Sequence, residues 1–342
     1  MRTRCSTSLG RVAGAILVIC LGTRFGTVAV GQTANPRGPV RIVATANWFG
    51  DTSGPLVYAA DGLTQVVQVF SGTTHREVGL ISGTVPAGLT VDGEGNVYVA
   101  DMGFISGGQR VLEFAPHGKK PVRILDDSGF QPDGLAVGPD GTVYVANDCP
   151  FVPSYGGCVQ GPGNVVAYAP GATQPTATLA VPGMRAPERV ALDAAGDIAV
   201  AGLTGFICSE CPPGKQIMGE FDSTHTKFTR IDITHPLTPM HFDSQGRLAL
   251  LRPSTNILDL YSLPSPKPVG RAQLGTPQPD AVRDFAFSSD GTDVWTSKIL
   301  YSPDLGHEEA MEFAYPGGQQ SAAFLVVGTF VGAIAVSPGL QP

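Results

Sequence analysis

The sequence predicts an all-β protein in which six four-stranded antiparallel sheets, called blades here, stand in a ring. Three observations predict it: a strand–turn–strand phrase recurs along the chain, an aromatic-ended strand follows each copy, and the two chain ends carry complementary halves of one further copy. The 342 residues include 44 Gly and 29 Pro, a supply of turn formers that favours many short strands over helices.

The strand–turn–strand phrase is clearest as "PAGLTVDGEGNVYVAD" (86–101) and "QPDGLAVGPDGTVYVAND" (131–148). Three more degenerate copies lie at 186–203, 237–253 and 281–298. In each copy two apolar runs flank a turn rich in Asp, Ser and Gly, the residues that a tight hairpin needs. Each copy therefore predicts the first and second strands of one blade.

A third strand that ends in an aromatic residue follows each pair, and a less regular fourth strand closes the unit, as at 121–125 and 176–180. The aromatic residues are Phe70, Phe114, Tyr168, Phe221, Tyr261 and Phe313. There are thus six third strands but only five complete pairs before them. The spacing of these aromatics, between 40 and 54 residues, is that of one blade per unit.

The chain ends supply the missing pair. Residues 55–61 form a second strand with no first strand before it, and residues 331–339 form a first strand with no second strand after it. Pairing the two closes the ring, which a circular array requires because each sheet buries its faces only against its neighbours. The prediction is one propeller domain over 41–342, preceded by a linker at 32–40.

The phrase at 86–101 and 132–148 resembles the core of NHL repeats, so the chain resembles NHL-type six-bladed β-propellers of the gluconolactonase and TolB-like propeller superfamily. The resemblance covers roughly residues 40–339 and weakens in the last three blades. It implies a fold that supports both enzymes and non-catalytic binding proteins, so function has to come from the site.

Residues 1–31 resemble a secretory signal, with a basic start followed by the short apolar block "VAGAILVICLG". We expect an exported protein, extracellular or periplasmic. Lipid attachment at Cys20 is not expected, because the preceding Ile19 is not small. Without this segment 18 Lys and Arg face 29 Asp and Glu, and this acidic balance argues against nucleic-acid and membrane partners. We expect a monomer.

The long insertions, at 102–109, 148–163, 204–215 and 298–309, all fall on links at one end of the ring, which we call the loop face. Two rings of residues are expected to point into the central channel there. The first ring lies just before the first strands and consists of Ala87, Asp133, Glu188, Thr238, Arg283 and Gly332. The second ring ends the second strands and consists of Asp61, Asp101, Asn147, Gly202, Arg252 and Lys298. The members predicted to bind ligand are Asp61, Asp101, Asp133, Asn147, Glu188, Arg252, Arg283 and Lys298.

The predicted function is recognition of a protein or a small polar ligand on the loop face, without a cofactor and without catalysis. The alternative is a calcium-dependent hydrolase or lyase, similar to lactonases. The resemblance to the gluconolactonase and paraoxonase propellers implies a calcium ion in the channel, for which Asp133, Asn147 and Glu188 would be the ligands here. The cationic residues on the opposite side of the channel speak against this alternative.

Four cysteines remain after the signal segment. In an exported chain they predict two disulfides, most simply Cys149–Cys158 and Cys208–Cys211, although crossed bridges between the two loops are also compatible with the order. The bridges would rigidify loops on the face proposed for binding.

Overall fold

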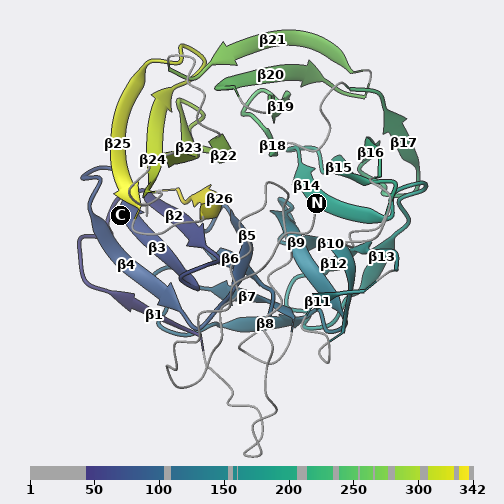
Figure 1. Ribbon diagram of the computed structural model, residues 1–342, viewed down its shortest axis with the longest axis horizontal. Helices are drawn as coiled ribbons and strands as arrows, with labels where there is room; N and C mark the ends of the chain where they lie inside the picture. The colour runs from purple at the N-terminus through teal and green to yellow at the C-terminus, as the bar shows by residue number, and fades with distance from the viewer. Residues whose placement is uncertain are drawn as a thin grey trace, which may run out of the picture.

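A computed structural model shows six antiparallel sheets arranged in a ring (Figure 1). The structure describes residues 44–103, 109–152, 157–159, 161–205, 214–233, 239–252, 255–264, 266–275, 282–300, 307–326 and 331–338. The predicted all-β, six-bladed fold is confirmed. No helix capable of crossing a membrane occurs in these ranges.

The four strands of each blade follow the predicted order from the channel outward. From the first blade to the sixth, the first strands are β26 (Val331–Val336), β5 (Pro86–Val91), β9 (Phe130–Val137), β14 (Ala186–Leu192), β18 (Met240–Phe242) and β22 (Val282–Phe287). The second strands are β2 (Leu56–Asp61), β6 (Val97–Asp101), β10 (Val143–Val152), β15 (Ile198–Leu203), β19 (Leu248–Leu251) and β23 (Asp293–Leu300).

The third strands are β3 (Val66–Ser71), β7 (Arg110–Phe114), β12 (Asn164–Tyr168), β16 (Gln216–Phe221), β20 (Ile257–Ser262) and β24 (His307–Ala314). The fourth are β4 (Glu77–Ser82), β8 (Arg123–Asp126), β13 (Ala177–Leu179), β17 (Phe228–Ile231), β21 (Lys267–Gln273) and β25 (Gln320–Val326). All six predicted aromatic residues of the third strands are buried. They pack between blades, where each sheet covers the face of the next.

The ring closes as the two chain ends predicted. Strand β26 pairs antiparallel with β2, with Tyr58 opposite Ala335 and Val57 opposite Val336. The first blade therefore takes its innermost strand from the C-terminal end of the chain. This closure joins segments far apart in the sequence. The backbone N–H of Leu56 also donates to Ser337 Oγ at 3.0 Å, across a separation of 281 residues.

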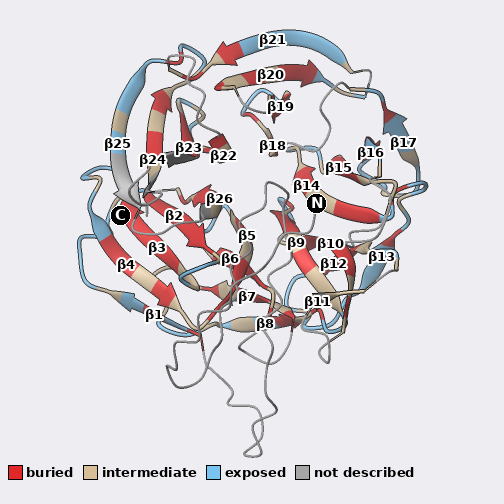
Figure 2. Ribbon diagram, viewed as in Figure 1, coloured by how far each residue is buried: buried red, intermediate tan, exposed pale blue. Residues whose placement is uncertain are grey.

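Two short strands were not predicted. Strand β1 (Thr45–Trp48) adds a fifth, outermost strand to the first blade by pairing with β4. Strand β11 (Gly157–Cys158) folds back on the end of β10. Figure 2 shows that the inner strands are mostly buried, whereas outer strands such as β21 are exposed along most of their length.

The turns between first and second strands repeat one geometry. In the second blade, Asp92 Oδ1 accepts hydrogen bonds from the backbone N–H groups of Glu94 and Asn96, both at 2.9 Å. Gly95 then adopts a φ of 84°, a left-handed conformation that glycine adopts without strain. The fourth and fifth blades repeat both features with Asp193 and Asp243. These are the Asp and Gly residues on which the hairpin prediction rested.

Candidate functional site at the loop face of the channel

A β-bulge recurs at the loop-face end of the first strand in five blades. In the second blade Pro86 lies opposite Asp101 and Gly88 lies opposite Ala100, so Ala87 is the extra residue. The corresponding extra residues in the other four blades are Asp133, Glu188, Arg283 and Gly332. These are members of the first predicted ring. A bulge twists the strand locally and re-aims side chains, and such bulges are common beside functional sites.

The innermost strands approach one another closely beside these bulges. A Cβ atom on Gly88 would lie 1.9 Å from the carbonyl oxygen of Asp133 in the next blade. A Cβ atom on Gly134 would likewise lie 2.7 Å from the carbonyl oxygen of Glu188. The glycine that follows the bulge thus lets neighbouring first strands meet around a narrow channel.

The channel is lined by ionisable side chains from four blades. Asp133, Arg189, His241 and Asp284 line it together with small residues such as Gly332. Arg189 Nη1 lies 2.8 Å from Asp133 Oδ2, and the Arg189 side chain is 34% exposed, the Asp133 side chain 21%. His241 Nε2 lies 3.9 Å from Asp284 Oδ1. The channel space is small, about 40 Å³, so only the head group of a ligand fits between these side chains.

The Arg189 guanidinium is the cation at the centre of this charge cluster. Asp133, and more weakly Asp284, raise its pKa, while partial burial opposes them. Its Nη1 also donates to the backbone carbonyl of Glu188 at 3.0 Å. A guanidinium held in this way presents a planar donor array to a carboxylate or another polar acceptor.

Two further carboxyl groups lie near the cluster on the third and fourth blades. Burial and the nearby Asp133 carboxylate raise the pKa of Glu188 to about 7, although the Arg189 cation acts to lower it. Burial raises the pKa of Asp148 well above its usual range, and Asp133 and Glu188 add to this. These side chains thus carry less negative charge near neutral pH than their number suggests.

We expect the stability of the fold to fall as the pH rises from about 4.5 to about 7, because the folded protein binds the Glu188 proton more tightly than the unfolded chain does. Glu188→Gln removes this effect and should stabilise the protein at pH 8 by about 2 kcal/mol while leaving it unchanged at pH 4. Urea unfolding of both proteins at the two pH values measures this. An equal difference at pH 4 and pH 8 would contradict the assignment.

The structure places the acidic and amide members of the second predicted ring away from open solvent. Asp61 and Asp101 are fully buried. Asp61 Oδ1 accepts from the backbone N–H groups of Leu63 and Thr64, at 2.8 and 3.0 Å. Asp101 accepts from Arg110 Nε at 3.0 Å and from the backbone N–H of Val85 at 2.9 Å. Both carboxylates organise the turns around them, and their role in ligand binding stays a prediction.

Asn147 is also fully buried. Its Nδ2 donates to Asn164 Oδ1 at 2.7 Å and to Asp127 Oδ1 at 3.2 Å, so the side chain faces the boundary between the second and third blades. Asp133 and Glu188, by contrast, are brought together by the two adjacent bulges. The predicted calcium set is therefore divided between two places.

The residues present do not fit a calcium ion in the channel. The Arg189 guanidinium is paired with Asp133 where the ion would need the carboxylate, and Asn147 makes its contacts elsewhere. Asp148, Cys149 and Cys158 are the one close group of three potential metal ligands in the described ranges. Because the two cysteines form a disulfide, they offer no thiolate to a metal.

The predicted cationic members lie on the last two blades. Arg252 forms a fork with Asp259, with Nη2 2.7 Å from Oδ2 and Nε 3.0 Å from Oδ2. Arg283 is the bulge residue of the sixth blade. Lys298 lies in β23 opposite Glu309 of β24. The contribution of these three residues to binding stays a prediction.

Sequence reasoning missed Arg189, His241 and Asp284, which follow the predicted ring positions by one residue or more in their first strands. For Arg189 and Asp284 the signal that could have found them is the bulge, because it brings two successive residues to the channel side where a regular strand would show only one. His241 lies in the regular part of β18 that the structure describes, and no such signal marks it.

The disulfide Cys149–Cys158 is confirmed, and it ties the end of β10 to β11 at the loop face. The predicted partner bridge, Cys208–Cys211, lies outside the described residues. Closing a loop of this length contributes roughly 2–3 kcal/mol by restricting the unfolded chain. The bridge stands beside Asp148, whose Oδ1 lies 3.0 Å from Cys149 Sγ.

The comparisons with solved structures agree with this fold. A protein of unknown function from Bacteroides caccae matches with a TM-score of 0.57 at 10% identity, over 83% of this chain and 99% of that chain. TolB from Acinetobacter baumannii matches with a TM-score of 0.57 at 13% identity, over 84% of this chain and 68% of that chain.

A functionally unknown protein from Desulfotomaculum acetoxidans matches with a TM-score of 0.54 at 13% identity, over 84% of this chain and 99% of that chain. No family model matches the sequence, and no curated protein matches it. At these identities the likeness establishes the propeller fold alone, and the closer relation to NHL repeats stays a prediction.

Proposed function

We propose that this propeller is an exported binding scaffold, and that the loop-face end of its channel binds a small zwitterionic ligand. The observation that carries the proposal is the Arg189–Asp133 pair, whose atoms approach to 2.8 Å inside a ring of bulged strands. Charges that are partly withdrawn from water cost free energy unless they are paired, and such groups concentrate at binding sites.

The charge pattern favours a ligand with both signs. Arg189 offers donors to a carboxylate, while Asp284 and the ionised fraction of Glu188 offer acceptors to an amine. A ligand with one charge would satisfy one part of the cluster and be repelled by the other. The narrow channel admits the head group and leaves the rest of the ligand at the loop face.

Export is part of this proposal. The disulfide Cys149–Cys158 supports it, because such bonds persist in oxidising compartments. The same bridge restrains the loop between β10 and β11 on the loop face, and a restrained loop costs less free energy to order when a ligand binds.

The test is a two-dimensional NMR titration read at the backbone amides of Gly88, Gly134 and Gly332, which line the channel. The zwitterionic probe is 4-aminobutyrate, and butyrate and n-butylammonium are its single-charge analogues. We expect saturable binding of 4-aminobutyrate that is at least tenfold tighter than that of butyrate and is lost in Arg189→Met, because the guanidinium is the donor for its carboxylate. Butyrate binding as tightly as the zwitterion, or unchanged binding by the Arg189 variant, would refute the proposal.

A further inference from the structure

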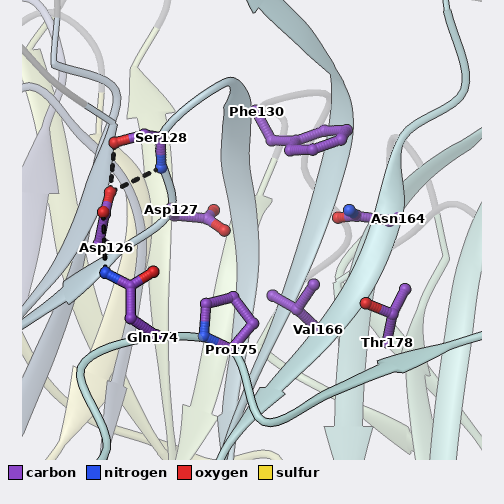
Figure 3. Close-up of a pocket in the computed structure, with 9 residues that line it drawn as sticks. All are labelled: Asp126, Asp127, Ser128, Phe130, Asn164, Val166, Gln174, Pro175 and Thr178. Carbon is purple, nitrogen blue, oxygen red and sulfur yellow. Dashed lines mark hydrogen bonds between the residues drawn. The ribbon is translucent and has the colours of Figure 1, made fainter.

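A second cleft lies at the periphery of the propeller, between the second and third blades. Its volume is about 230 Å³. It runs from the turn after β8 to the third and fourth strands of the third blade (Figure 3). The nine lining residues are Asp126, Asp127, Ser128, Phe130, Asn164, Val166, Gln174, Pro175 and Thr178. They belong to a different part of the molecule from the channel cluster.

A buried carboxylate with an unpartnered oxygen stands in the wall of this cleft. Asp127 is only 4% exposed, and its Oδ2 is buried without a hydrogen-bond partner among the described residues. The other oxygen, Oδ1, accepts from Tyr168 Oη at 3.0 Å and from Asn147 Nδ2 at 3.2 Å. Figure 3 shows the Asp127 carboxylate directed into the cleft toward Asn164 on the opposite wall.

A buried acceptor without a hydrogen bond costs free energy, so a ligand that brings a donor to Asp127 Oδ2 would be favoured. Burial raises the pKa of Asp127 to about 6, against the two hydrogen bonds that lower it, so the group is mostly ionised above neutral pH. The last side-chain torsion of Asp is broad, and a modest rotation about it turns Oδ2 toward the open space. The complementary ligand group is therefore a cationic donor.

The rest of the lining agrees with a cation that carries a short apolar chain. No Lys or Arg occurs among the nine lining residues, and Asp126 adds a second carboxylate. The oxygens of Asp126 are already engaged, since Gln174 Nε2 donates to Oδ2 at 3.0 Å and Ser128 donates to Oδ1. Phe130, Val166 and Pro175 supply apolar surface for an alkyl group.

A divalent metal fits this cleft less well. The one close group of three Asp, Glu, His or Cys ligands in the described ranges lies at Asp148, not here. A divalent ion would require several oxygen ligands around it, whereas an ammonium group needs only acceptors on one side.

We propose that the cleft between the second and third blades is a binding site for a primary alkylammonium group, recognised by the Asp127 carboxylate. The site is separate from the zwitterion site proposed in the channel and does not depend on it. A small apolar chain on the ligand would lie against Phe130 and Val166, and the ammonium group would supply the missing donor to Oδ2.

The experiment is a two-dimensional NMR titration of the oxidised protein with n-butylammonium chloride, at constant ionic strength and pH 7.5. We expect saturable shifts of the Asn164 and Gln174 side-chain amides, and no such shifts with the neutral analogue n-butanol. Asp127→Asn keeps the acceptor for Tyr168 but replaces the unpartnered oxygen with an NH₂ donor, so we expect at least tenfold weaker affinity for n-butylammonium.

The matched control is Asp133→Asn, which neutralises a carboxylate in the channel and should leave the affinity of the cleft for n-butylammonium unchanged. Conversely, Asp127→Asn should leave the 4-aminobutyrate shifts of the channel glycines Gly88 and Gly332 unchanged, while any shifts that its ammonium group causes at Asn164 and Gln174 should be lost. The two sites are read by separate signals, so the two proposals fail independently. Equal affinities for n-butylammonium and n-butanol, unaltered affinity in Asp127→Asn, or shifts produced by calcium chloride but not by n-butylammonium would overturn the assignment. If Asp127→Asn fails to fold, the charged and neutral probes on the native protein still decide.

Discussion

Gly88→Ala is expected to destabilise the propeller by about 3 kcal/mol or more. The new Cβ would lie 1.9 Å from the carbonyl oxygen of Asp133, which belongs to the backbone of the next blade and cannot turn aside as a side chain can. The first strands of the second and third blades would have to separate. Because these strands also carry the bulges, the channel site should be lost together with stability.

The matched control is Gly93→Ala in the exposed turn of the same hairpin, where nothing lies within 4 Å of the added Cβ. Guanidinium unfolding of the native protein and both variants measures the difference. A loss below about 1 kcal/mol in Gly88→Ala, similar to that of the control, would show that the innermost strands adjust freely and that the bulge ring is not rigid.

Arg189→Met is expected to cost about 2 kcal/mol of stability at pH 7.5, because it leaves the Asp133 carboxylate without its cation beside Glu188 and Asp284. The loss should shrink at pH 5, where Glu188 is protonated, since its pKa lies near 7 even with Arg189 in place. The second substitution Asp133→Asn should restore part of the lost stability, because it removes the unpaired charge.

Arg252→Met is a close control for this prediction. The Arg252 side chain is 31% exposed, close to the 34% of Arg189, and it is paired with one carboxylate. In Arg252→Met the Asp259 carboxylate still pairs with Arg271, whose Nε lies 2.9 Å from Asp259 Oδ1, so no carboxylate loses its only cation. Thermal unfolding of both variants at pH 5 and pH 7.5 should show a pH-dependent loss for Arg189→Met only. A loss of equal size at both pH values would mean that the Arg189 side chain acts by packing.

The fold could be predicted from the sequence because each blade repeats the same residue types at the same turn. Asp92 and Gly95 specify one hairpin turn, and the same residue types specify it again in later blades. The complementary end strands then fixed the number of blades and the closure. Strand β1 escaped prediction because a four-residue strand with no counterpart in other blades gives no repeat signal.

The candidate site could be predicted from the sequence only in part. The alignment of repeats pointed to Asp133 and Glu188, which the structure has at two adjacent bulges, but it treated each first strand as regular. The bulge brings Arg189, one residue further along, into the same cluster, and no single hairpin pattern encodes that shift. Asp61 and Asp101 were placed at the correct strand ends, but their hydrogen bonds were not predicted. Asp61 accepts from the turn that directly follows it, whereas Asp101 accepts from Val85, which precedes the first strand of its blade.

The most direct test of the central claim is the two-dimensional NMR spectrum of the native protein titrated with 4-aminobutyrate. The channel glycines Gly88, Gly134 and Gly332 line the proposed site and have no side chains to complicate their amide signals. The account predicts that these three signals shift together and saturate, while those of Gly95 and Gly196 in the turns at the other end of the blades stay in place. Shifts confined to the turn glycines, or no saturable shift of the channel glycines, would contradict it.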